Sequence, residues 1–561
     1  MHAVAVSVIA LALCVNAATL MSSLTTNTLP MQQQVNNVDK HKINLKKIHI
    51  ENGQFVDSDG VIHIFHGSSF VDKNKDMVKI STEGMEILST EWGFNIARVG
   101  FEWNLLEIEQ NGRRVYNMTY MAALEDIVDR FGEHGIYSFL DMHQDCWAHL
   151  FCGHGLPNFY AHPYNFKWYK KSGAFAFPEP ITRPKYANSS SNENFPEISN
   201  CNEAESGPLG WAGCYATMGL GSAAQRFYDN REGYLERFGD MWARVAQRFA
   251  GKPHVLGYEL INEPWVGDPY TNPLLWDPAH ADKVNLHKVN QYLHKRIREF
   301  DDETIIFYEP STGGNLNPVD VGFPSGPGGD KYNDRQALSY HQYCYFPLAP
   351  NDKIKNSFIR RFLGRITDEL CEDRLKEIIG VRAKDIERLG GGGLLTEYAA
   401  ITHPAYQEGI DAAYYMQGLM NQYKQGWVYW LQMPTHDIAP EILRLITPTF
   451  ARKIAGTVTA VSFDNRTSRF ELSMRVDHRQ NRQTVESKDS SNEIAEIYFN
   501  RDVYYATGFR CVTQPENVAK CRTNPKNHNL LHVILNKNDN FQRNVSNPNS
   551  EASITVILEA V

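Results

Sequence analysis

Two short stretches, Leu260–Ile261–Asn262–Glu263–Pro264 and Leu394–Leu395–Thr396–Glu397–Tyr398, each contain an apolar run that leads into a glutamate. Such runs are typical of strands that are buried on both faces of a parallel sheet. Pro264 stops the first strand, which leaves Glu263 at the carboxyl end of that strand. In a parallel barrel the side chains at this end of the strands face the binding cleft. We therefore predict a parallel barrel with both glutamates at its rim.

Around these two stretches, residues 43–445 alternate short apolar runs with helical patterns. The predicted strands are Val61–His66, Phe94–Val99, Tyr137–Met142, Val255–Ile261, Thr304–Tyr308, Ala337–His341, Gly393–Thr396 and Trp427–Leu431. The predicted helices are Tyr120–Phe131, Arg237–Phe249, Asp282–Arg298, Ile354–Leu389 in pieces, and Tyr406–Tyr423. The crossover at 311–334 is rich in Gly and Pro, and we expect it to lack a regular helix. This alternation indicates an α/β fold of the (β/α)8, or TIM barrel, class.

One connection, residues 146–235 after the third strand, is far longer than most loops. It is rich in aromatic residues and contains four cysteines, and we expect part of it to build the binding site. A disordered decoration is the alternative.

The pattern changes after residue 446 to short alternating strands, which indicates an antiparallel β-sandwich over 446–561. The predicted strands are Val458–Phe463, Arg469–Val476, Ala495–Asn500, His532–Leu535 and Ile554–Leu558. We expect a structural accessory domain, with carbohydrate binding as the alternative.

The amino terminus has the pattern of a secretory signal peptide, because the apolar run Val4–Val15 precedes Ala17 and Ala18. We expect residues 1–18 to be cleaved, with a retained anchor as the alternative. Residues 19–42 are then a flexible amino terminus. The predicted location is secreted, whether extracellular, in a digestive lumen or lysosomal.

The cysteines agree with secretion, because eight remain after Cys14 leaves with the signal peptide. An even number in an oxidising compartment favours disulfides. Pairing of sequence neighbours is the simplest scheme and gives Cys146–Cys152, Cys201–Cys214, Cys344–Cys371 and Cys511–Cys521. Asn-x-Ser/Thr acceptors also predict a glycoprotein. They stand at Asn117, Asn188, Asn465 and Asn544.

The overall charge excludes some functions. A formal net charge of -9 gives no basic footprint for nucleic acid and no polybasic membrane anchor. No His/Cys/Asp cluster has the spacing of metal ligands, so we expect neither a metal nor another cofactor.

The two rim glutamates suit the hydrolysis of a glycosidic bond, in which one carboxylic acid protonates the leaving oxygen while a second carboxylate attacks or activates water. A glutamate at a strand end is often only an ion-pair partner, and Glu309 is a rival carboxylate. Further side chains at other strand ends favour a catalytic site, because packing of a core does not require them. They are Arg98, His143, His341, Tyr343 and Trp430.

Arg98, Asn262–Glu263–Pro264, His341–Gln342–Tyr343, Glu397 and Trp430 together resemble glycoside hydrolase family 5. More narrowly, the chain from about Ile43 onward is similar to the endoglycoceramidases. That similarity is carried by His66–Gly67 followed by Lys73, by 141–145 (DMHQD), by 307–310 (FYEP), by 426–430 (GWVYW) and by 449–456 (TFARKIAG).

The resemblance implies a retaining endo-β-glycosidase that separates oligosaccharide from ceramide by double displacement, with Glu397 as nucleophile and Glu263 as acid/base. It implies that Lys73, His143 and Asp145 bind glucose hydroxyls, that Trp430 is a stacking floor and that His341 belongs to the same pocket. Asn262 is then placed to bind the sugar 2-hydroxyl, and Arg98 and Tyr343 keep Glu397 ionised.

The implied partner is a glycosphingolipid, either a ganglioside or a neutral glycolipid, which a monomer meets transiently at a lipid surface or micelle. A glucosylceramidase or a polysaccharide endoglycosidase on the same barrel is one alternative. A secreted glycolipid-binding lectin that has lost turnover is another, although the presence of both glutamates argues against it.

Overall fold

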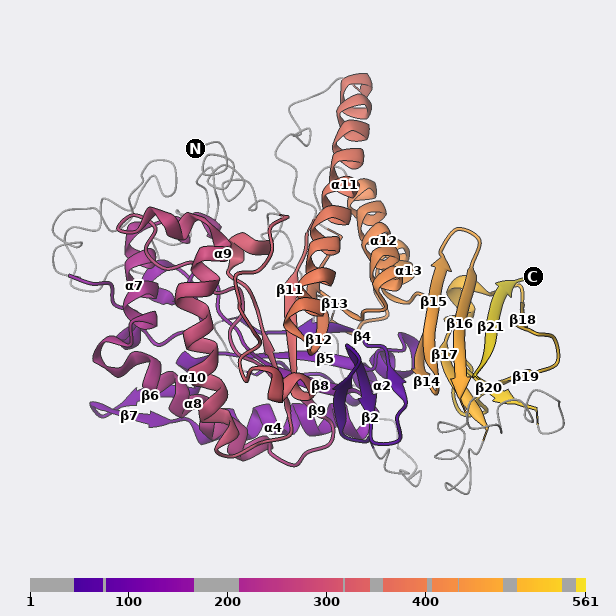
Figure 1. Cartoon of the computed structure of the whole chain (residues 1–561), viewed down its shortest axis with the longest axis horizontal. Coiled ribbons are helices and arrows are strands. Elements are labelled where there is room, and N and C mark those ends of the chain that lie inside the picture. Colours follow the sequence, from indigo (N-terminus) through magenta and orange to yellow (C-terminus); the bar gives the residue numbers. More distant parts are fainter. Residues whose placement is uncertain are drawn as a thin grey trace, which may run out of the picture.

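The computed structural model describes residues 45–73, 77–165, 211–315, 318–343, 357–400, 406–431, 433–477, 492–536 and 551–561. The predicted signal peptide and flexible amino terminus lie outside these residues, as do much of the long insertion, Cys201, Cys344, Asn188 and Asn544. In Figure 1 the barrel lies on the left and in the centre, and the carboxyl-terminal strands lie to its right.

Eight parallel strands close a barrel in the order β10-β11-β12-β13-β4-β5-β8-β9, which confirms the predicted TIM barrel. Their bounds are β4 His66–Phe70, β5 Ile96–Phe101, β8 Tyr137–Met142, β9 Val255–Glu259, β10 Ile305–Tyr308, β11 Gln336–His341, β12 Gly392–Tyr398 and β13 Trp427–Tyr429. Every residue of these strands is buried, as expected where helices cover the outside of a parallel sheet.

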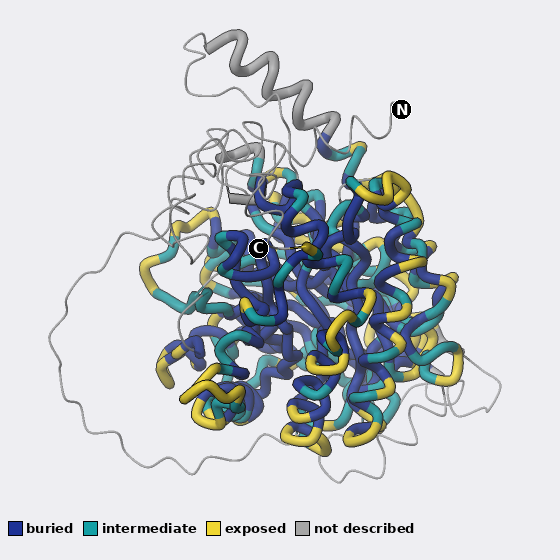
Figure 2. The backbone as a smooth tube through the Cα atoms, turned by 90° about the vertical axis from the view of Figure 1, so that its left-hand side faces the viewer, coloured by how far each residue is buried: buried dark blue, intermediate teal, exposed yellow. Residues whose placement is uncertain are grey.

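The longer helices of the barrel region are α4 Met118–Glu133, α7 Met218–Tyr228, α8 Tyr234–Phe249, α10 His287–Arg298, α11 Ser357–Leu389 and α12 Tyr406–Tyr423. Figure 2 shows the buried chain at the centre and exposed residues on the outer turns. Helix α11 is continuous rather than in pieces. Between β10 and β11 the described residues form only 3-10 turns, at Thr312–Asn315 (η10) and Asp330–Arg335 (η11), as the Gly/Pro content predicts. Within the described part of the chain, no helix is both long and apolar enough to cross a membrane.

The first barrel strand begins later than predicted. Within the predicted strand Val61–His66, the structure places β3 at Ile62–His63, which pairs with β2 (Gln54–Asp57) and with β14 (Phe450–Ile454). The barrel strand β4 starts at His66. Both runs are strands, and local periodicity does not reveal which of two sheets a strand joins.

The carboxyl-terminal region is a pair of antiparallel sheets, as predicted. A seven-stranded sheet has the order β1-β2-β3-β14-β17-β20-β19, and a four-stranded sheet has the order β15-β16-β21-β18. The remaining bounds are β1 Ile48–Glu51, β15 Thr457–Asp464, β16 Arg469–Asp477, β17 Glu493–Tyr498, β18 Phe509–Gln514, β19 Ala519–Thr523, β20 Leu530–Leu535 and β21 Glu551–Ala560. Strands of both sheets contribute to one apolar core. Strands β1–β3 precede the barrel in sequence but belong to the seven-stranded sheet. A domain boundary at residue 446 therefore assigns the strands of this sheet to two different domains.

The disulfides agree with the predicted scheme only in part. Cys511–Cys521 is present, but Cys146 pairs with Cys214, so the predicted Cys146–Cys152 and Cys201–Cys214 bonds are wrong. The 3-10 turn Trp211–Cys214 (η6) brings the far end of the insertion back to the loop after β8, with Cα atoms of Cys146 and Cys214 5.8 Å apart. Sequence proximity gives no sign of such a return. Cys152 and Cys371 are disulfide-bonded as well.

Candidate active site

Glu263 and Glu397 meet at the carboxyl end of the barrel. Glu397 lies in β12, and Glu263 lies four positions after the end of β9. One carboxyl oxygen of each lies within 4.8 Å of the other and of a ring nitrogen of His341. Retaining glycosidases hold their two carboxyl groups about 5–5.5 Å apart, whereas inverting enzymes need about 6.5–9.5 Å to admit a water. The spacing therefore fits a double displacement.

The turn that carries Glu263 is held by hydrogen bonds from the loops that follow two other barrel strands, β8 and β10. The backbone of Glu263 is left-handed, with φ of 41°, which is uncommon for a residue with a side chain. The Gln144 amide, after β8, donates to the carbonyls of Asn262 at 2.7 Å and Glu263 at 3.0 Å. The Thr312 hydroxyl, after β10, also donates to the Glu263 carbonyl, at 2.8 Å. These bonds fix a conformation that the chain would otherwise disfavour.

The surroundings of Glu263 favour its protonated form. Its side chain is 19% exposed, and its Oε1 lies 2.9 Å from Nδ1 of His341. Burial and then the negative charge of Asp145 raise the pKa of Glu263 to about 7, against the opposing charges of His143, Arg98 and Lys73. A carboxyl group that keeps its proton near neutral pH can act as a general acid.

Glu397 has the two partners that the sequence predicts. Arg98 donates from Nη1 to Oε2 at 3.1 Å, and the Tyr343 hydroxyl donates to Oε1. Burial nevertheless raises the pKa of Glu397, because desolvation outweighs the opposing effects of His341 and of the Arg98 guanidinium, and the charge of Glu263 adds to the rise. The predicted effect of Arg98 and Tyr343 is thus opposed by burial.

Arg98 is wholly buried and binds several polar groups of the barrel interior. Its Nε donates to Glu259 at 2.6 Å, and its Nη2 lies 3.1 Å from a carboxylate oxygen of Asp141. Nη2 also donates to the side-chain oxygen of Asn262 at 2.7 Å. One N–H of the Asn262 amide donates to the Gln144 carbonyl at 2.8 Å. This amide carries two N–H groups, and the second makes no hydrogen bond to the part of the chain that the structure describes.

The remaining predicted binding residues form one wall of the site. Asp145 accepts from Lys73, and its Oδ2 lies 3.6 Å from Nε2 of His143. The Lys73 ammonium lies 4.8 Å from the centre of the Trp430 ring, on which His143 stacks at 5.3 Å. The fold therefore brings together four of the predicted binding residues, as a shared role in binding requires. They are Lys73, His143, Asp145 and Trp430.

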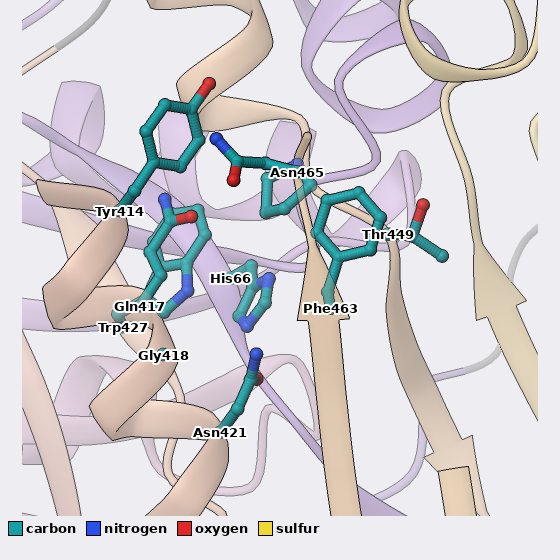
Figure 3. A pocket seen from close by; sticks show the side chains of 10 residues that line it. His66, Tyr414, Gln417, Gly418, Asn421, Trp427, Thr449, Phe463 and Asn465 are labelled. Atoms are coloured by element: carbon teal, nitrogen blue, oxygen red, sulfur yellow. The ribbon is translucent and has the colours of Figure 1, made fainter. Parts of the chain in front are cut away.

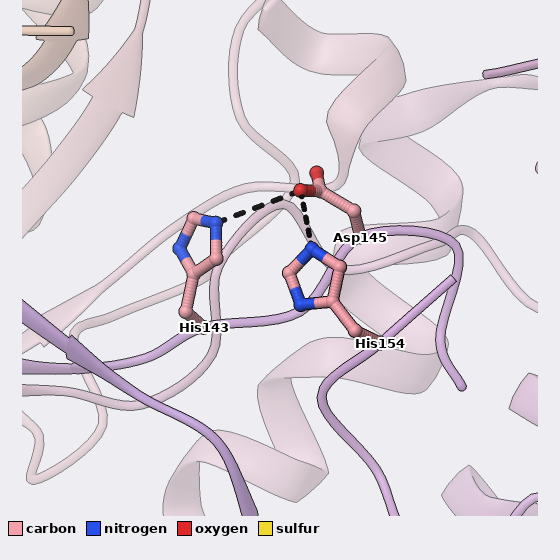
Figure 4. A group of neighbouring side chains, drawn as sticks. All are labelled: His143, Asp145 and His154. Atoms are coloured by element: carbon pink, nitrogen blue, oxygen red, sulfur yellow. Dashed lines mark hydrogen bonds and ion pairs between the residues drawn. The ribbon is translucent and has the colours of Figure 1, made fainter. Parts of the chain in front are cut away.

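Sequence reasoning missed His154 and did not single out Gln144 as a site residue. Figure 4 shows one carboxylate oxygen of Asp145 linked to a ring nitrogen of both His143 and His154. Nε2 of His154 lies 2.9 Å from Asp145, and its Nδ1 lies 3.0 Å from Glu102. His154 lies within the insertion, where no strand pattern marks it, so its place beside Asp145 could not be predicted.

His143, Asp145 and His154 could by geometry hold a cation, because one ligand atom of each lies within 4.8 Å of the others. Their protonation argues against that use. Burial lowers the pKa of His143, but the charges of Asp141 and Asp145 outweigh it and raise the pKa to about 9. The imidazolium and the ammonium of Lys73 already balance the charges of Asp141 and Asp145.

A separate recess lies between α12 and the carboxyl-terminal sheets (Figure 3). It is lined by His66 and Trp427 of the barrel, by Tyr414 of α12, and by Phe463 and Asn465. The predicted glycosylation acceptor Asn465 therefore lies at its edge. None of the predicted catalytic or binding residues lines this recess.

A closed parallel barrel with two carboxyl groups at retaining distance, one protonated near neutrality, defines a retaining glycoside hydrolase. Comparison with known proteins agrees. Residues 56–435 match the family model described as cellulase (glycosyl hydrolase family 5), and residues 449–546 match the glycoside hydrolase family 5 C-terminal domain.

Among curated proteins, the chain is 30% identical over 501 residues to an endoglycoceramidase of Cyanea nozakii, with 84% of this chain and 88% of that protein covered. It is also 30% identical over 490 residues to an endoglycoceramidase of Hydra vulgaris, with 83% and 82% covered. The chain therefore belongs to glycoside hydrolase family 5, and within it to the endoglycoceramidases.

Solved structures share the fold. Endo-glycoceramidase II from Rhodococcus sp. in complex with ganglioside GM3 has a TM-score of 0.59 and 19% identity, with 90% of this chain and 99% of that chain covered. Sterylglucosidase 1 of Cryptococcus neoformans has a TM-score of 0.62 and 14% identity, with 92% and 97% covered.

Proposed function

We propose that this chain hydrolyses the linkage between oligosaccharide and ceramide in glycosphingolipids, with retention at the anomeric carbon. Glu397 attacks the anomeric carbon of the glucose while Glu263 gives its proton to the departing ceramide oxygen. Glu263 then takes a proton from the water that releases the oligosaccharide. The observation that carries this proposal is the distance of at most 4.8 Å between one oxygen of each carboxyl group.

The wall beside the two glutamates supports sugar binding. Lys73, Asp145 and His143 offer charged hydrogen-bonding groups to glucose hydroxyls, and Trp430 offers a flat aromatic face. The free N–H of Asn262 binds the 2-hydroxyl, an interaction that strengthens in the transition state. Each of these groups is held by neighbours before substrate arrives, which reduces the entropy lost on binding.

The ceramide part of the proposal is supported by the two curated relatives. Both are named endoglycoceramidase, and this chain is similar to each of them over most of its length. We further propose that the chain is secreted and works as a monomer in transient contact with lipid surfaces or micelles. Its disulfides support an oxidising compartment, because such bonds are rare in cytosolic proteins.

A product assay on a purified ganglioside tests the proposal. We expect intact oligosaccharide and ceramide, separated by chromatography, with the β-anomer of the sugar appearing first by NMR. Cleavage of glucosylceramide alone would indicate a glucosylceramidase, and cleavage of a β-glucan alone would indicate a polysaccharide endoglycosidase. Either result contradicts the proposed substrate.

Replacing the nucleophile separates an enzyme from a lectin. Glu397→Gln keeps the shape of the side chain but removes the attacking charge, so release should fall by roughly 10³-fold or more. Binding of ganglioside micelles should remain measurable. Glu441→Gln, on an exposed turn of α13 (Pro440–Ile446), is the matched control and should keep full activity. If the unaltered protein binds ganglioside without releasing product, the lectin alternative holds.

A further inference from the structure

Glu309 lies directly after β10, is buried, and has no role in the steps proposed above. Among the described residues, neither of its carboxyl oxygens has a hydrogen-bond partner, and neither has Nε2 of His341. These unpartnered groups face each other, with Oε1 of Glu309 3.4 Å from Nε2 of His341. Buried polar groups seldom stay unpaired, so a shared proton between the two is the simplest resolution.

We propose that Glu309 is a neutral carboxylic acid whose O–H donates a hydrogen bond to Nε2 of His341, so that His341 presents its Nδ1–H to Glu263. This inference deepens the proposed function, because it assigns a positioning residue to the acid/base of that site. Glu309 touches no reacting atom and acts only through His341.

The charges around Glu309 favour its neutral form. Three carboxyl groups lie around it, namely Glu259 of β9, Asp141 of β8 and Glu263 after β9, and Arg98 is a nearby cation, with Nη2 3.7 Å from Oε1. Arg98 is already bound to Glu259, Asp141 and Glu397. A fourth carboxylate charge in this dry interior would lack compensation. Burial, followed by the charge of Glu259, accordingly raises the pKa of Glu309 well above its usual range.

The other side of His341 favours the same arrangement. Its Nδ1 lies 2.9 Å from Oε1 of Glu263 and 3.7 Å from Oε2 of Glu397. A hydrogen on Nδ1 is attracted to both carboxyl groups, whereas a lone pair there would be repelled by the ionised nucleophile. Burial lowers the pKa of His341, so the ring is neutral and carries one N–H. The bond made by one ring nitrogen decides which nitrogen carries that hydrogen.

The arrangement has a consequence for the second half of the reaction. After Glu263 has given up its proton, it must exist as a carboxylate and take a proton from water. A fixed Nδ1–H of His341 donates to that carboxylate and stabilises it. Without the O–H of Glu309, His341 could adopt its other tautomer. That tautomer carries its hydrogen on Nε2 and presents a lone pair on Nδ1 to Glu263.

The tautomer of His341 can be measured without turnover. We expect a long-range ¹H–¹⁵N spectrum of the unaltered, ¹⁵N-histidine-labelled full chain to show His341 neutral, with Nδ1 protonated and Nε2 not. His341→Gln identifies its signals by their loss. A neutral ring protonated at Nε2 would overturn the proposal. Because no substrate is needed, this result is independent of whether the chain cleaves glycosphingolipids.

Kinetics on phenyl β-lactoside, whose weakly acidic phenol needs the proton of Glu263 in order to leave, give a second test that does not depend on ceramide. Glu309→Gln keeps a neutral N–H donor toward Nε2, so the alkaline limb of kcat/KM should stay where it is. Asp145→Asn is the charge-loss control and should move that limb to lower pH, because Asp145 raises the pKa of Glu263. Glu309→Leu lacks the donor. Its kcat on an activated dinitrophenyl β-lactoside, which is limited by hydrolysis of the covalent intermediate, should fall at least about tenfold. A limb that moves to lower pH in Glu309→Gln would mean that Glu309 is ionised, and would overturn the proposal.

Discussion

Two carboxyl groups within 4.8 Å must exist in opposite protonation states for the proposed reaction, and their surroundings decide which is which. Glu397 has a guanidinium and a phenol as donors, whereas Glu263 faces Asp145 and an imidazole. As the pH rises, Glu397 therefore loses its proton first, and Glu263 loses its proton near pH 7. Such a pair titrates as a unit, with two apparent pKa values.

The pH dependence of kcat/KM follows from these assignments. Because Glu263 must be protonated to act as the acid, kcat/KM should fall about tenfold per pH unit once the pH exceeds about 7. Because Glu397 must be ionised and its pKa is raised, the acid limb should lie above the ordinary carboxyl value of 4.5. Initial rates on a glycolipid in mixed micelles between pH 4 and 9 give both limbs.

An aryl glycoside with a strongly acidic phenol provides the control for this assignment. Such a leaving group needs no proton, so the alkaline limb of kcat/KM should weaken or vanish with it. An alkaline limb that is unchanged with this substrate would show that another group titrates near pH 7.

At the scale of single elements, the loop after β8 holds the turn after β9. Gln144 is the link, because its amide bonds the carbonyls of Asn262 and Glu263. Gln144→Leu would leave the Asn262 carbonyl without this donor, which costs about 1–3 kcal/mol of stability. It would also release the left-handed turn at Glu263, so kcat should fall at least about tenfold. Denaturant unfolding and initial rates measure the two effects.

Gln417→Leu is the matched control for Gln144→Leu. Gln417 is also a buried glutamine that bridges two elements, since its amide donates to the Tyr398 hydroxyl at 2.8 Å and to the Leu445 carbonyl at 2.9 Å. It should lose comparable stability while kcat per folded molecule stays unchanged. If both variants lose kcat equally, Gln144 has only a structural role.

Much of the barrel could be predicted from its elements, because a buried parallel strand has an apolar run and an abrupt end. Glu263 and Glu397 stand at two such ends, and His143, His341 and Trp430 at others, so their meeting at one rim follows from the topology. Arg98 is predicted at a strand end but lies in the middle of β5, and it reaches Glu397 from the barrel interior. Other features depend on contacts far apart in the sequence. The Cys146–Cys214 bond, the place of His154 and the pairing of β3 with β14 leave no local pattern.

The same limit applies to the pKa of Glu397. Its donors Arg98 and Tyr343 are visible as residue types in the sequence, and they predict an easily ionised carboxyl. The depth of burial that raises its pKa exists only in the folded protein.

At the scale of the whole molecule, the barrel and the carboxyl-terminal sheets are connected by non-covalent contacts as well as by the chain itself. Strand β3 pairs with β14, and the His66 ring at the start of β4 stacks between Trp427 and Phe450, at 4.1 and 3.8 Å. The side-chain amide of Asn529 also donates to the Thr90 carbonyl at 3.3 Å. We therefore expect the two parts to unfold as one cooperative unit.

Tryptophan fluorescence can test this cooperativity, because all ten tryptophans precede residue 446 and thus report on the barrel region alone. Leu531→Ala lies in β20 of the larger sheet, where Leu531 is 1% exposed, and should remove about 2–5 kcal/mol. In one cooperative unit the fluorescence midpoint in denaturant moves down together with the far-UV dichroism midpoint. Leu274→Ala, at a side chain that is 64% exposed, should move neither. In Leu531→Ala, the fluorescence midpoint could instead stay fixed while the dichroism shows an additional transition at lower denaturant concentration. That result would mean that the barrel folds independently of the carboxyl-terminal sheets.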